Sequence, residues 1–192
     1  MILIIDNYDS FVFNIYQYIL EISSDDVKYY RNDKISLEEI ISLNPSHIIL
    51  SPGPKHPKDS AICLDILKSN LNIPILGVCL GHQAIGYSYG ANIKKLKTPF
   101  HGKISTLEVK NEGVLFDSLP REFDVMRYHS LYIDEDTLSS EFEILAKSKN
   151  DDIIMAIRHK NKPIFGIQFH PESYFTQYGK QIISNFINYN KK

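Results

Sequence analysis

Hydrophobic positions in the first half of the chain follow two alternating patterns. Short runs that are apolar at almost every position are expected for strands buried on both faces of a sheet, and they occur at 2–5, 47–50 and 73–78. Apolar residues at helical spacing predict helices at 11–22, 36–43, 59–68 and 80–89. With a short strand at 27–30, this alternation predicts βαβ units on a parallel sheet.

Polar residues mark where two of these helices begin and end. Asp9 and Ser10 offer N-cap side chains to the first helix. Ser36 and Glu39 have the spacing of a capping box, in which each side chain bonds the other residue's backbone N–H. An Asn-Pro pair at 44–45 then stops the second helix, because proline disfavours helical geometry at the residue before it.

The alternation of strands and helices ends at about residue 91. Beyond it, short segments separated by turn residues predict strands at 93–96, 104–109, 142–147, 153–158 and 164–169. A last amphipathic helix is predicted at 176–189. These later strands indicate a hairpin-rich extension and antiparallel additions to the sheet edge. Because no linker, repeat or low-complexity segment interrupts the pattern, we expect one α/β domain over residues 1–192.

Composition and charge exclude several classes of protein. The chain of 192 residues is 43% hydrophobic and 23% charged, which is ordinary for a globular protein with a core. Its net charge of −2, with both signs mixed, gives no footprint for nucleic acid or an anionic membrane. The apolar run at 1–5 is too short for a signal peptide or a transmembrane helix. Two cysteines in a chain too large to need a disulfide predict reduced thiols and a cytoplasmic location. The two cysteines and seven histidines show no zinc-ligand spacing, so we expect no metal.

The segment 77–81, Gly-Val-Cys-Leu-Gly, has the form of a nucleophile elbow with sulfur in place of oxygen. A predicted strand precedes Cys79 and a predicted helix follows it, as that motif requires. The helix N-terminus then points at the sulfur and favours the thiolate. The alternative is a small buried residue at a strand end, which is a common fate of a single cysteine. Cys63 fits that alternative, because it lies among apolar residues on a helix face.

A cysteine nucleophile needs a base, and the base needs an orienting group. His170 follows the predicted strand at 164–169, and Glu172 lies two residues further on. Because parallel sheets present functional residues at the carboxyl ends of their strands, His170 and Cys79 are expected to meet there. Glu172 can turn back to the imidazole and fix its tautomer. Taken alone, a histidine at a strand end is more often structural.

A proline-stiffened loop at 51–55, Ser-Pro-Gly-Pro-Lys, follows the strand at 47–50 and falls at the same edge of the sheet. Acyl transfer needs two preorganised N–H groups for the oxyanion of the tetrahedral intermediate. The backbone N–H of Leu80, directly after the nucleophile, is one natural donor, and Gly53 is a candidate for the second. The loop by itself is better explained as a rigid turn.

Six segments in one order share a pattern with a known family. They are 6–11 (DNYDSF) with Asn14, 51–54 (SPGP), 77–86 (GVCLGHQAIG), 101–103 (HGK), 127–131 (RYHSL) and 166–173 (GIQFHPES). Together they resemble the class I (triad) glutamine amidotransferases, and more narrowly the small subunits of anthranilate synthase and aminodeoxychorismate synthase. The resemblance covers the whole chain. It implies a three-layer, flavodoxin-like α/β fold with a mostly parallel sheet and antiparallel edge additions.

The resemblance also assigns roles to individual residues. It implies a triad of Cys79, His170 and Glu172 that hydrolyses L-glutamine to glutamate and ammonia without a cofactor. Its other implied site residues, which hold the oxyanion or the glutamine, are Gly53, Pro54, Lys55, Leu80, Gln83, Ser130 and Leu131. His82 receives no role, and we expect it at the surface or around the site.

One position departs from the family pattern. The family loop reads Pro-Gly-Pro-Gly, whereas this chain has Lys55 in the last position. We expect Lys55 to keep the backbone role and to point its amine outward. A positive φ at Lys55, or a side chain that blocks Cys79, would contradict this expectation.

The resemblance implies a partner, since a chain of this length has no domain for an acceptor substrate. That partner is a chorismate-binding synthase subunit, and residues 6–14 are expected to face it. Anthranilate formation for tryptophan is the leading interpretation, and aminodeoxychorismate formation for folate, or service to both, is the alternative. A non-catalytic glutamine-binding module and an independent cysteine hydrolase are rivals outside this class. The intact triad argues against the first rival, and Gln83 with Ser130 and Leu131 argues against the second.

Overall fold

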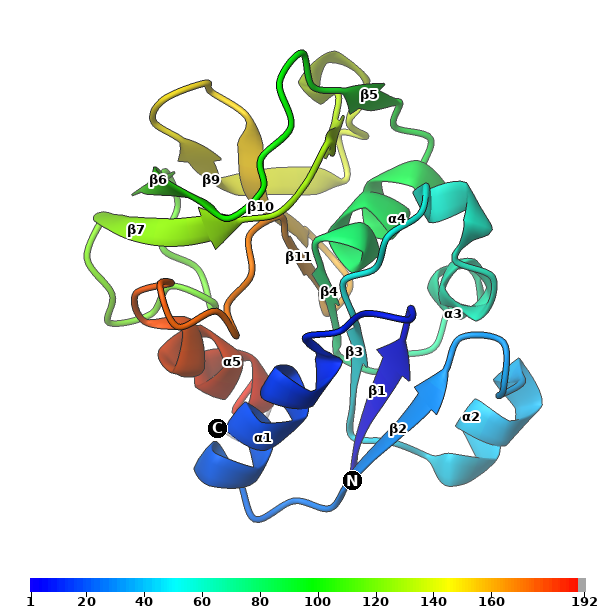
Figure 1. Ribbon diagram of the computed structural model, residues 1–192. Coiled ribbons are helices and arrows are strands. Elements are labelled where there is room, and N and C mark those ends of the chain that lie inside the picture. Colours follow the sequence, from blue (N-terminus) through cyan, green and yellow to red (C-terminus); the bar gives the residue numbers. More distant parts are fainter. Residues whose placement is uncertain (190–192) are drawn as a thin grey trace.

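The computed structural model describes residues 1–189, and within them nine strands form one sheet with helices on both faces (Figure 1). The strands are β1 (Ile2–Asp6), β2 (Val27–Arg31), β3 (His47–Leu50), β4 (Ile75–Val78), β6 (Lys103–Val109), β7 (Glu122–Arg127), β9 (Phe142–Ser148), β10 (Ile154–His159) and β11 (Ile164–Ile167). Their order across the sheet is β2-β1-β3-β4-β11-β10-β9-β6-β7. A separate two-stranded ribbon pairs β5 (Ile93–Lys95) with β8 (Leu131–Ile133).

The sheet has a parallel half and an antiparallel half. β2, β1, β3, β4 and β11 pair in parallel, with register contacts such as Ile2 to Val27 and Ile167 to Val78. From β11 outward, β10, β9, β6 and β7 pair in antiparallel fashion. The predicted βαβ sheet with antiparallel additions at one edge is therefore confirmed, together with the α/β fold class.

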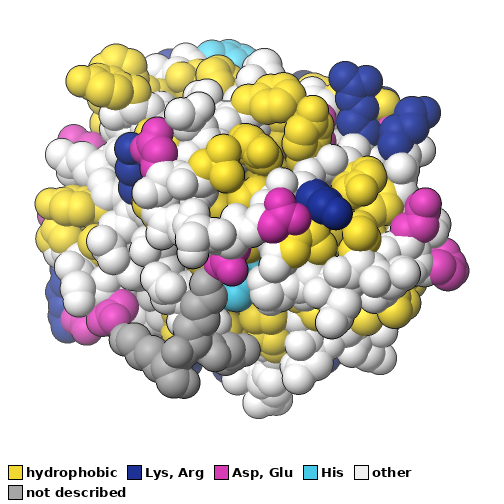
Figure 2. Space-filling view, turned by 90° about the horizontal axis from the view of Figure 1, so that it is seen from below, with side chains coloured by type: hydrophobic (Ala, Val, Ile, Leu, Met, Phe, Trp, Pro, Cys, Tyr) yellow, Lys and Arg dark blue, Asp and Glu magenta, His cyan; other side chains and the backbone are white. Residues whose placement is uncertain are grey.

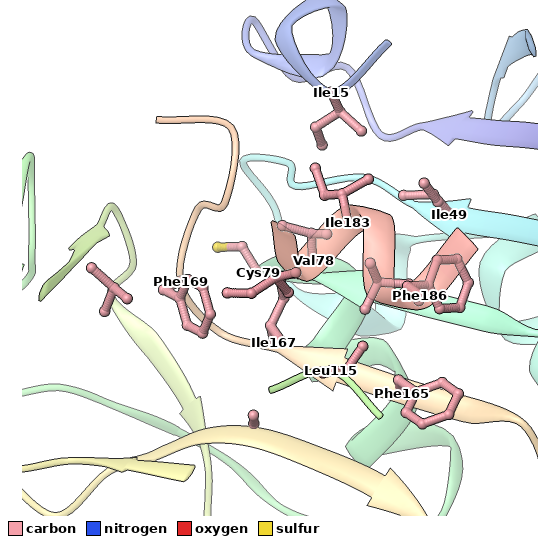
Figure 3. Packing of buried hydrophobic residues seen from close by; sticks show 14 of the residues in the cluster. Ile15, Ile49, Val78, Cys79, Leu115, Phe165, Ile167, Phe169, Ile183 and Phe186 are labelled. Carbon is pink, nitrogen blue, oxygen red and sulfur yellow. The ribbon is translucent and has the colours of Figure 1, made fainter. Parts of the chain in front are cut away.

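The helices are α1 (Val12–Ile22), α2 (Leu37–Leu43), α3 (Ile62–Lys68), α4 (Leu80–Ser88) and α5 (Gly179–Ile187), with short 3-10 turns at Pro57–Asp59 and Glu135–Thr137. α1 and α5 share one core with one face of the sheet, and α2, α3 and α4 share a second core with the other face. Figure 3 shows the first core, where Ile15 of α1 and Ile183 of α5 pack over Ile49 and Val78 of the sheet. Burying each such side chain contributes about 1.5–3 kcal/mol.

Alternation along β1 explains why two cores are needed. Ile2 and Ile4 belong to the α1–α5 core, whereas Leu3 and Ile5 belong to the α2–α3–α4 core. All four side chains are fully buried. A strand covered on both faces must be apolar at every position, which is the pattern that the sequence showed.

Several predicted boundaries are wrong, for identifiable backbone reasons. The N-cap of α1 is Phe11, without a side-chain hydrogen bond, and Asp9 Oδ1 instead accepts from the Phe11 backbone N–H at 2.8 Å. α3 begins at Ile62 rather than near residue 59, because Ala61 has φ of +41° and interrupts the helix. α5 likewise begins only after Tyr178, whose φ is +59°, and it ends at Ile187, shortly before the predicted end at 189.

Other local predictions are confirmed. Ser36 and Glu39 form the capping box of α2, and Asn44 ends that helix in the left-handed conformation. β7 and β8 were not predicted, since β7 begins with an exposed charged residue and β8 has only three residues.

The surface carries charges of both signs. In Figure 2, which shows the face seen from below in Figure 1, acidic and basic side chains are scattered among separate groups of hydrophobic side chains. One ion pair on the surface joins Lys180 of α5 to Glu21 of α1. No helix within residues 1–189 is both long and apolar enough to span a membrane.

Candidate active site

Cys79 lies in the sharp turn between β4 and α4, in a strained conformation with φ of +52° and ψ of −97°. Its backbone N–H donates to Ile167 of the neighbouring strand β11 at 2.8 Å, which ties the turn to the centre of the sheet. Figure 3 shows the sulfur at the edge of the packed core, on the side of the segment that carries Phe169. A non-glycine residue in this conformation costs about 1–3 kcal/mol, and such strain is concentrated at functional sites.

The two glycines beside Cys79 permit this tight turn. A Cβ atom on Gly77 would lie 2.5 Å from the backbone of Gly81, and one on Gly81 would lie 2.3 Å from the carbonyl oxygen of Leu50. These distances are well inside van der Waals contact, so larger residues would force the turn apart. The expected nucleophile elbow is present.

His170 and Glu172 form a buried pair close to this turn. His170 Nδ1 lies 2.6 Å from Glu172 Oε1, and both residues are 2% exposed. The His170 backbone N–H donates to Met126 at the end of β7, and its carbonyl accepts from Thr176 Oγ1. β7 and the loop residue Thr176 thus hold the segment that carries the imidazole.

The second ring nitrogen of His170 faces Cys79. His170 Nε2 is buried and makes no hydrogen bond of regular geometry to residues 1–189. Burial alone lowers the pKa of His170, but the charge and hydrogen bonding of Cys79, joined by Glu172, raise the pKa well above its usual value. The structure therefore brings the three side chains together in the order Cys79, His170 and Glu172.

Aromatic rings cover the outer side of the imidazole. The rings of Tyr128 and Phe11 meet that of His170 edge to face, with centroids 5.2 and 6.2 Å away, and they lie 5.6 Å from each other. Both are partly exposed, at 37% and 38%. They shield His170 from water. Sequence reasoning missed this cover, because Phe11 and Tyr128 belong to distant segments that only the fold brings together.

The loop after β3 packs against the elbow. A Cβ atom on Gly53 would lie 2.7 Å from both Asn7 and the Leu80 side chain, so the loop meets the residue after β1 and the first residue of α4 there. Asn7 secures the loop, because its backbone N–H donates to Ser51 Oγ and its side chain to Ser51 O, each at 2.8 Å. Leu80 is the first residue of α4, where backbone N–H groups have no acceptor within the helix.

Lys55 has the conformation expected from the sequence. It is exposed, and it is not among the residues with positive φ. With Pro54 and Leu80 it borders a cavity of about 450 Å³ that also reaches Tyr8.

Gln83 of α4 reaches across to the first residue of β8. Its Nε2 donates to Leu131 O at 2.8 Å and to Gln168 Oε1 at 3.1 Å. Both N–H bonds of the Gln83 amide are therefore used within the protein, and its carbonyl oxygen is left to accept from a donor. Ser130 lies next to Leu131 and its carbonyl accepts from Leu96 N–H.

A buried chain of polar residues, unforeseen from the sequence, supports this segment. Arg127 is fully buried and donates from Nε to His129 Nε2 at 2.9 Å and from Nη1 to Asp151 at 3.0 Å. With its Nε2 accepting, His129 carries its proton on Nδ1 and donates it to Leu131 O at 2.8 Å. Burial, followed by the charge of Arg127, lowers the pKa of His129 to about 3. His129 therefore stays neutral and holds Leu131 in place.

Two other residues from the sequence analysis have clear positions. His82 is fully buried against Gly166, so of the two expected positions the surface is excluded and a position around the site remains. Burial, followed by the repulsion that His129 adds when it is protonated, lowers the pKa of His82 to about 3. Cys63 is a core thiol, as expected: burial raises its pKa to about 12, and it donates to Asn7 Oδ1 at 3.3 Å. Within residues 1–189, no group of three His, Cys, Asp or Glu side chains is arranged to hold a metal.

The match to known proteins covers nearly the whole chain. Residues 3–189 match the family described as glutamine amidotransferase class-I. The chain belongs to this family. This amidotransferase is 52% identical to anthranilate synthase component 2 of Pyropia yezoensis, and the match covers 98% of this chain and 100% of the relative. It is 47% identical to aminodeoxychorismate synthase component 2 of Klebsiella aerogenes, with 98% and 100% coverage.

A longer relative and a solved structure complete the comparison. The amidotransferase is 48% identical to the bifunctional protein TrpGD of Thermotoga maritima, over 97% of this chain but only 32% of that protein. It also resembles the crystal structure of a Thermoplasma acidophilum protein described as a GMP synthase component. That likeness has a TM-score of 0.85 and 30% identity, and it covers 97% and 92% of the two chains.

Proposed function

We propose that this amidotransferase hydrolyses L-glutamine through Cys79, His170 and Glu172 and delivers the ammonia to a chorismate-binding synthase subunit. The buried His170–Glu172 pair beside the strained elbow of Cys79 carries the proposal. In this arrangement the nucleophile, the base and the orienting carboxylate all come from the protein, so only the substrate has to bind. We propose no cofactor.

In the first half of the reaction the Cys79 sulfur attacks the side-chain amide carbon of glutamine. The S–C bond forms, the tetrahedral intermediate collapses, and the C–N bond breaks as His170 gives its proton to the departing nitrogen. In the second half, water attacks the γ-glutamyl thioester while His170 removes a proton from it. The C–S bond breaks, which releases glutamate and restores the thiolate. Glu172 keeps the imidazole proton on Nδ1 while the neutral ring acts as base.

Two backbone groups are proposed to stabilise the oxyanion. The Leu80 N–H lies at the free N-terminus of α4, and Gly53 packs directly against Leu80. N–H groups aimed at a developing negative charge are worth about 3–4 kcal/mol each in transition-state stabilisation. Pro52 and Pro54 flank Gly53 and stiffen the loop, and Ser51 ties the loop to Asn7. Gly53 is thereby kept in position. Pro54 and Lys55 then form the wall of the pocket through their backbone, with the Lys55 amine directed to solvent.

The glutamine head group is assigned to Gln83, Ser130 and Leu131. The free carbonyl oxygen of Gln83 suits the α-ammonium group, since its two N–H bonds are already donated. Backbone groups of Ser130 and Leu131 are proposed to bind the α-carboxylate. Their fixed position through His129 and Arg127 fits a site that must recognise one amino acid.

The partner surface is proposed to lie around the aromatic residues at the site. Phe11 and Tyr128 cover His170, while Tyr174 and Phe175, 91% and 57% exposed, follow soon after Glu172. Exposed aromatic side chains are typical of protein interfaces. Phe11 itself belongs to residues 6–14, which were expected to face the partner. Covering this surface would also keep released ammonia from solvent.

We propose anthranilate formation as the main use of the ammonia, with aminodeoxychorismate formation as the alternative, since the relatives carry both names. The whole chain, 1–192, is proposed to act as one domain in the cytoplasm, where Cys63 and Cys79 remain reduced. The buried His170–Glu172 pair argues against a purely glutamine-binding module, which would not need an oriented base. An independent hydrolase would have no use for the Gln83–Leu131 arrangement.

The test is ammonia release from glutamine by the purified chain, alone and with each candidate synthase subunit plus chorismate. We expect turnover in the wild type that one synthase raises, and loss of turnover in Cys79→Ala. Cys63→Ala is the matched control, because it removes the other thiol and should leave turnover intact. Full activity in Cys79→Ala, or no response to any chorismate-binding partner, would overturn the proposal.

A further inference from the structure

Gln168 lies between the candidate nucleophile and the glutamine-binding residue Gln83. It directly follows β11, whose last residue Ile167 pairs with Val78, the residue before Cys79. The parallel pairing of β11 with β4 therefore places Gln168 beside Cys79. Gln168 is fully buried, and its Nε2 lies 3.6 Å from Cys79 Sγ while its Oε1 accepts from Gln83 at 3.1 Å.

The hydrogen bonds fix which end of the Gln168 amide faces the sulfur. Leu131 O is a carbonyl and can only accept, so Gln83 must present Nε2 toward it. The second N–H of that nitrogen then points at Gln168, which must answer with Oε1. Its Nε2 is left facing Cys79 Sγ. The reverse orientation would place a carbonyl oxygen against the sulfur and two NH₂ groups against each other.

The same chain of contacts continues to the far side of the site. Leu131 O also accepts from His129 Nδ1, and His129 is held in turn by the buried Arg127. A sequence of buried hydrogen bonds thus links the sulfur to the segment proposed to bind the α-carboxylate of glutamine. Because Gln168, Gln83 and His129 are buried and joined by these hydrogen bonds, their side chains have few alternative arrangements, so the donor at the sulfur is preorganised.

We propose that Gln168 is a positioning residue that donates a hydrogen bond to the Cys79 thiolate and orients the Gln83 amide. The inference rests on the proposed function and deepens it, because it assigns Gln168 a part in the reaction of the same cysteine. A hydrogen bond from an N–H group is stronger when its acceptor is charged. The bond from Gln168 therefore favours thiolate over thiol and holds the sulfur in one rotamer. A purely structural glutamine would fill the same space without affecting the reactivity of the sulfur.

The test separates these two roles by measuring alkylation of Cys79 with iodoacetamide, without glutamine, as a function of pH. Gln168→Met keeps the volume and removes the donor, and Gln168→Glu keeps the shape and places oxygen against the sulfur. We expect alkylation at neutral pH to be about tenfold slower in Gln168→Met than in wild type, and slower still in Gln168→Glu. In both variants, the pH at which the rate is half its maximum should be higher than in wild type. Gln181→Met is the matched control, since the exposed Gln181 on α5 bonds only Asn185 among the described residues.

Glutamine kinetics supply the second readout. Because Gln83 keeps its bond to Leu131, we expect kcat to fall more than KM rises in Gln168→Met. Thermal unfolding shows which variant is folded, and either folded variant suffices for the test. If a folded variant has the alkylation rate and pH profile of the wild type, the inference is overturned. This holds even when the wild-type chain releases ammonia from glutamine. By contrast, a wild-type chain that neither releases ammonia nor reacts at Cys79 would overturn the proposed function itself.

Discussion

Nδ1 of His170 lies 2.6 Å from Oε1 of Glu172, and neither residue is more than 2% exposed. A carboxylate buried at this distance accepts the Nδ1–H and leaves Nε2 as the atom that is proposed to exchange a proton with the sulfur. Glu172 Oε2 is itself buried and has no hydrogen-bond partner within residues 1–189. The bond to His170 is therefore the hydrogen bond that satisfies the Glu172 carboxylate, and the same bond orients the imidazole.

Glu172→Gln should damage the reaction while preserving the fold. The amide can present N–H to Nδ1 and so favour the wrong tautomer, which we expect to lower kcat by roughly 10²- to 10⁴-fold. Steady-state glutaminase assays with the synthase partner would measure this. Glu21→Gln changes an exposed carboxylate that pairs with Lys180, and it should keep wild-type activity. Equal activity in Glu172→Gln and wild type would remove Glu172 from the mechanism.

The protonation of His170 should depend on Cys79. Burial lowers the pKa of His170, but Cys79 and Glu172 raise it well above its usual value, so Cys79→Ala should lower that pKa. Because the folded-state pKa exceeds the unfolded one, the bound proton stabilises the fold below about pH 6.5, and this stability is lost as pH rises through the folded pKa. NMR titration of the imidazole in both proteins would measure the shift. An unchanged pKa in Cys79→Ala would show that the two groups do not interact.

His82 should make the protein sensitive to acid. Burial lowers its pKa to about 3, so between that value and the unfolded pKa of about 6.5 the unfolded chain binds one proton more. The stability is present above this window and falls as pH decreases through it. His82→Met should reduce proton uptake on unfolding near pH 5 by about one, measured from denaturant unfolding against pH.

The exposed Gln181 gives the control for this prediction, since its side chain does not titrate and Gln181→Met should leave the pH dependence of unfolding unchanged. A slope in His82→Met equal to that of wild type would mean that His82 takes up its proton in the folded state.

Ala61→Gly should stabilise the protein. Ala61 is exposed and has φ of +41° with ψ of −113°, a region that glycine adopts without its steric cost. Relief of that strain should raise the free energy of unfolding by about 1 kcal/mol. Denaturant melts would measure it, with Ala91→Gly as the contrast, because Ala91 is buried, lacks positive φ and should lose stability. A lower Tm for Ala61→Gly would contradict the strain assigned to this turn.

The elements that could be predicted from sequence are those whose surroundings dictate their pattern. β1, β3 and β4 are buried on both faces, and only apolar runs suit that position. β7 was missed because it begins with an exposed charged residue, and β8 because it has only three residues and pairs with β5, which lies far away in the sequence. The start of α3 depends on the positive φ of Ala61, which the identity of an alanine does not indicate.

The same distinction applies to the site. Cys79, His170 and Glu172 were found because each belongs to a short pattern with a chemical reason at that spacing. Gln168 and Arg127 lay in segments already noticed, yet their contacts arise only when β11 lies beside β4 and when the segment before β8 folds over α4. Burial of polar residues is a property of the assembled fold, which one chain segment does not reveal.

The central claim is that Cys79 carries the γ-glutamyl group during turnover. Rapid acid quenching of the chain with glutamine, followed by intact-mass and peptide analysis, tests it directly. We predict a mass increase of one γ-glutamyl group on the peptide that contains Cys79, retained in Cys63→Ala and absent in Cys79→Ala. An adduct on any other residue, or ammonia release that continues in Cys79→Ala, would contradict the account.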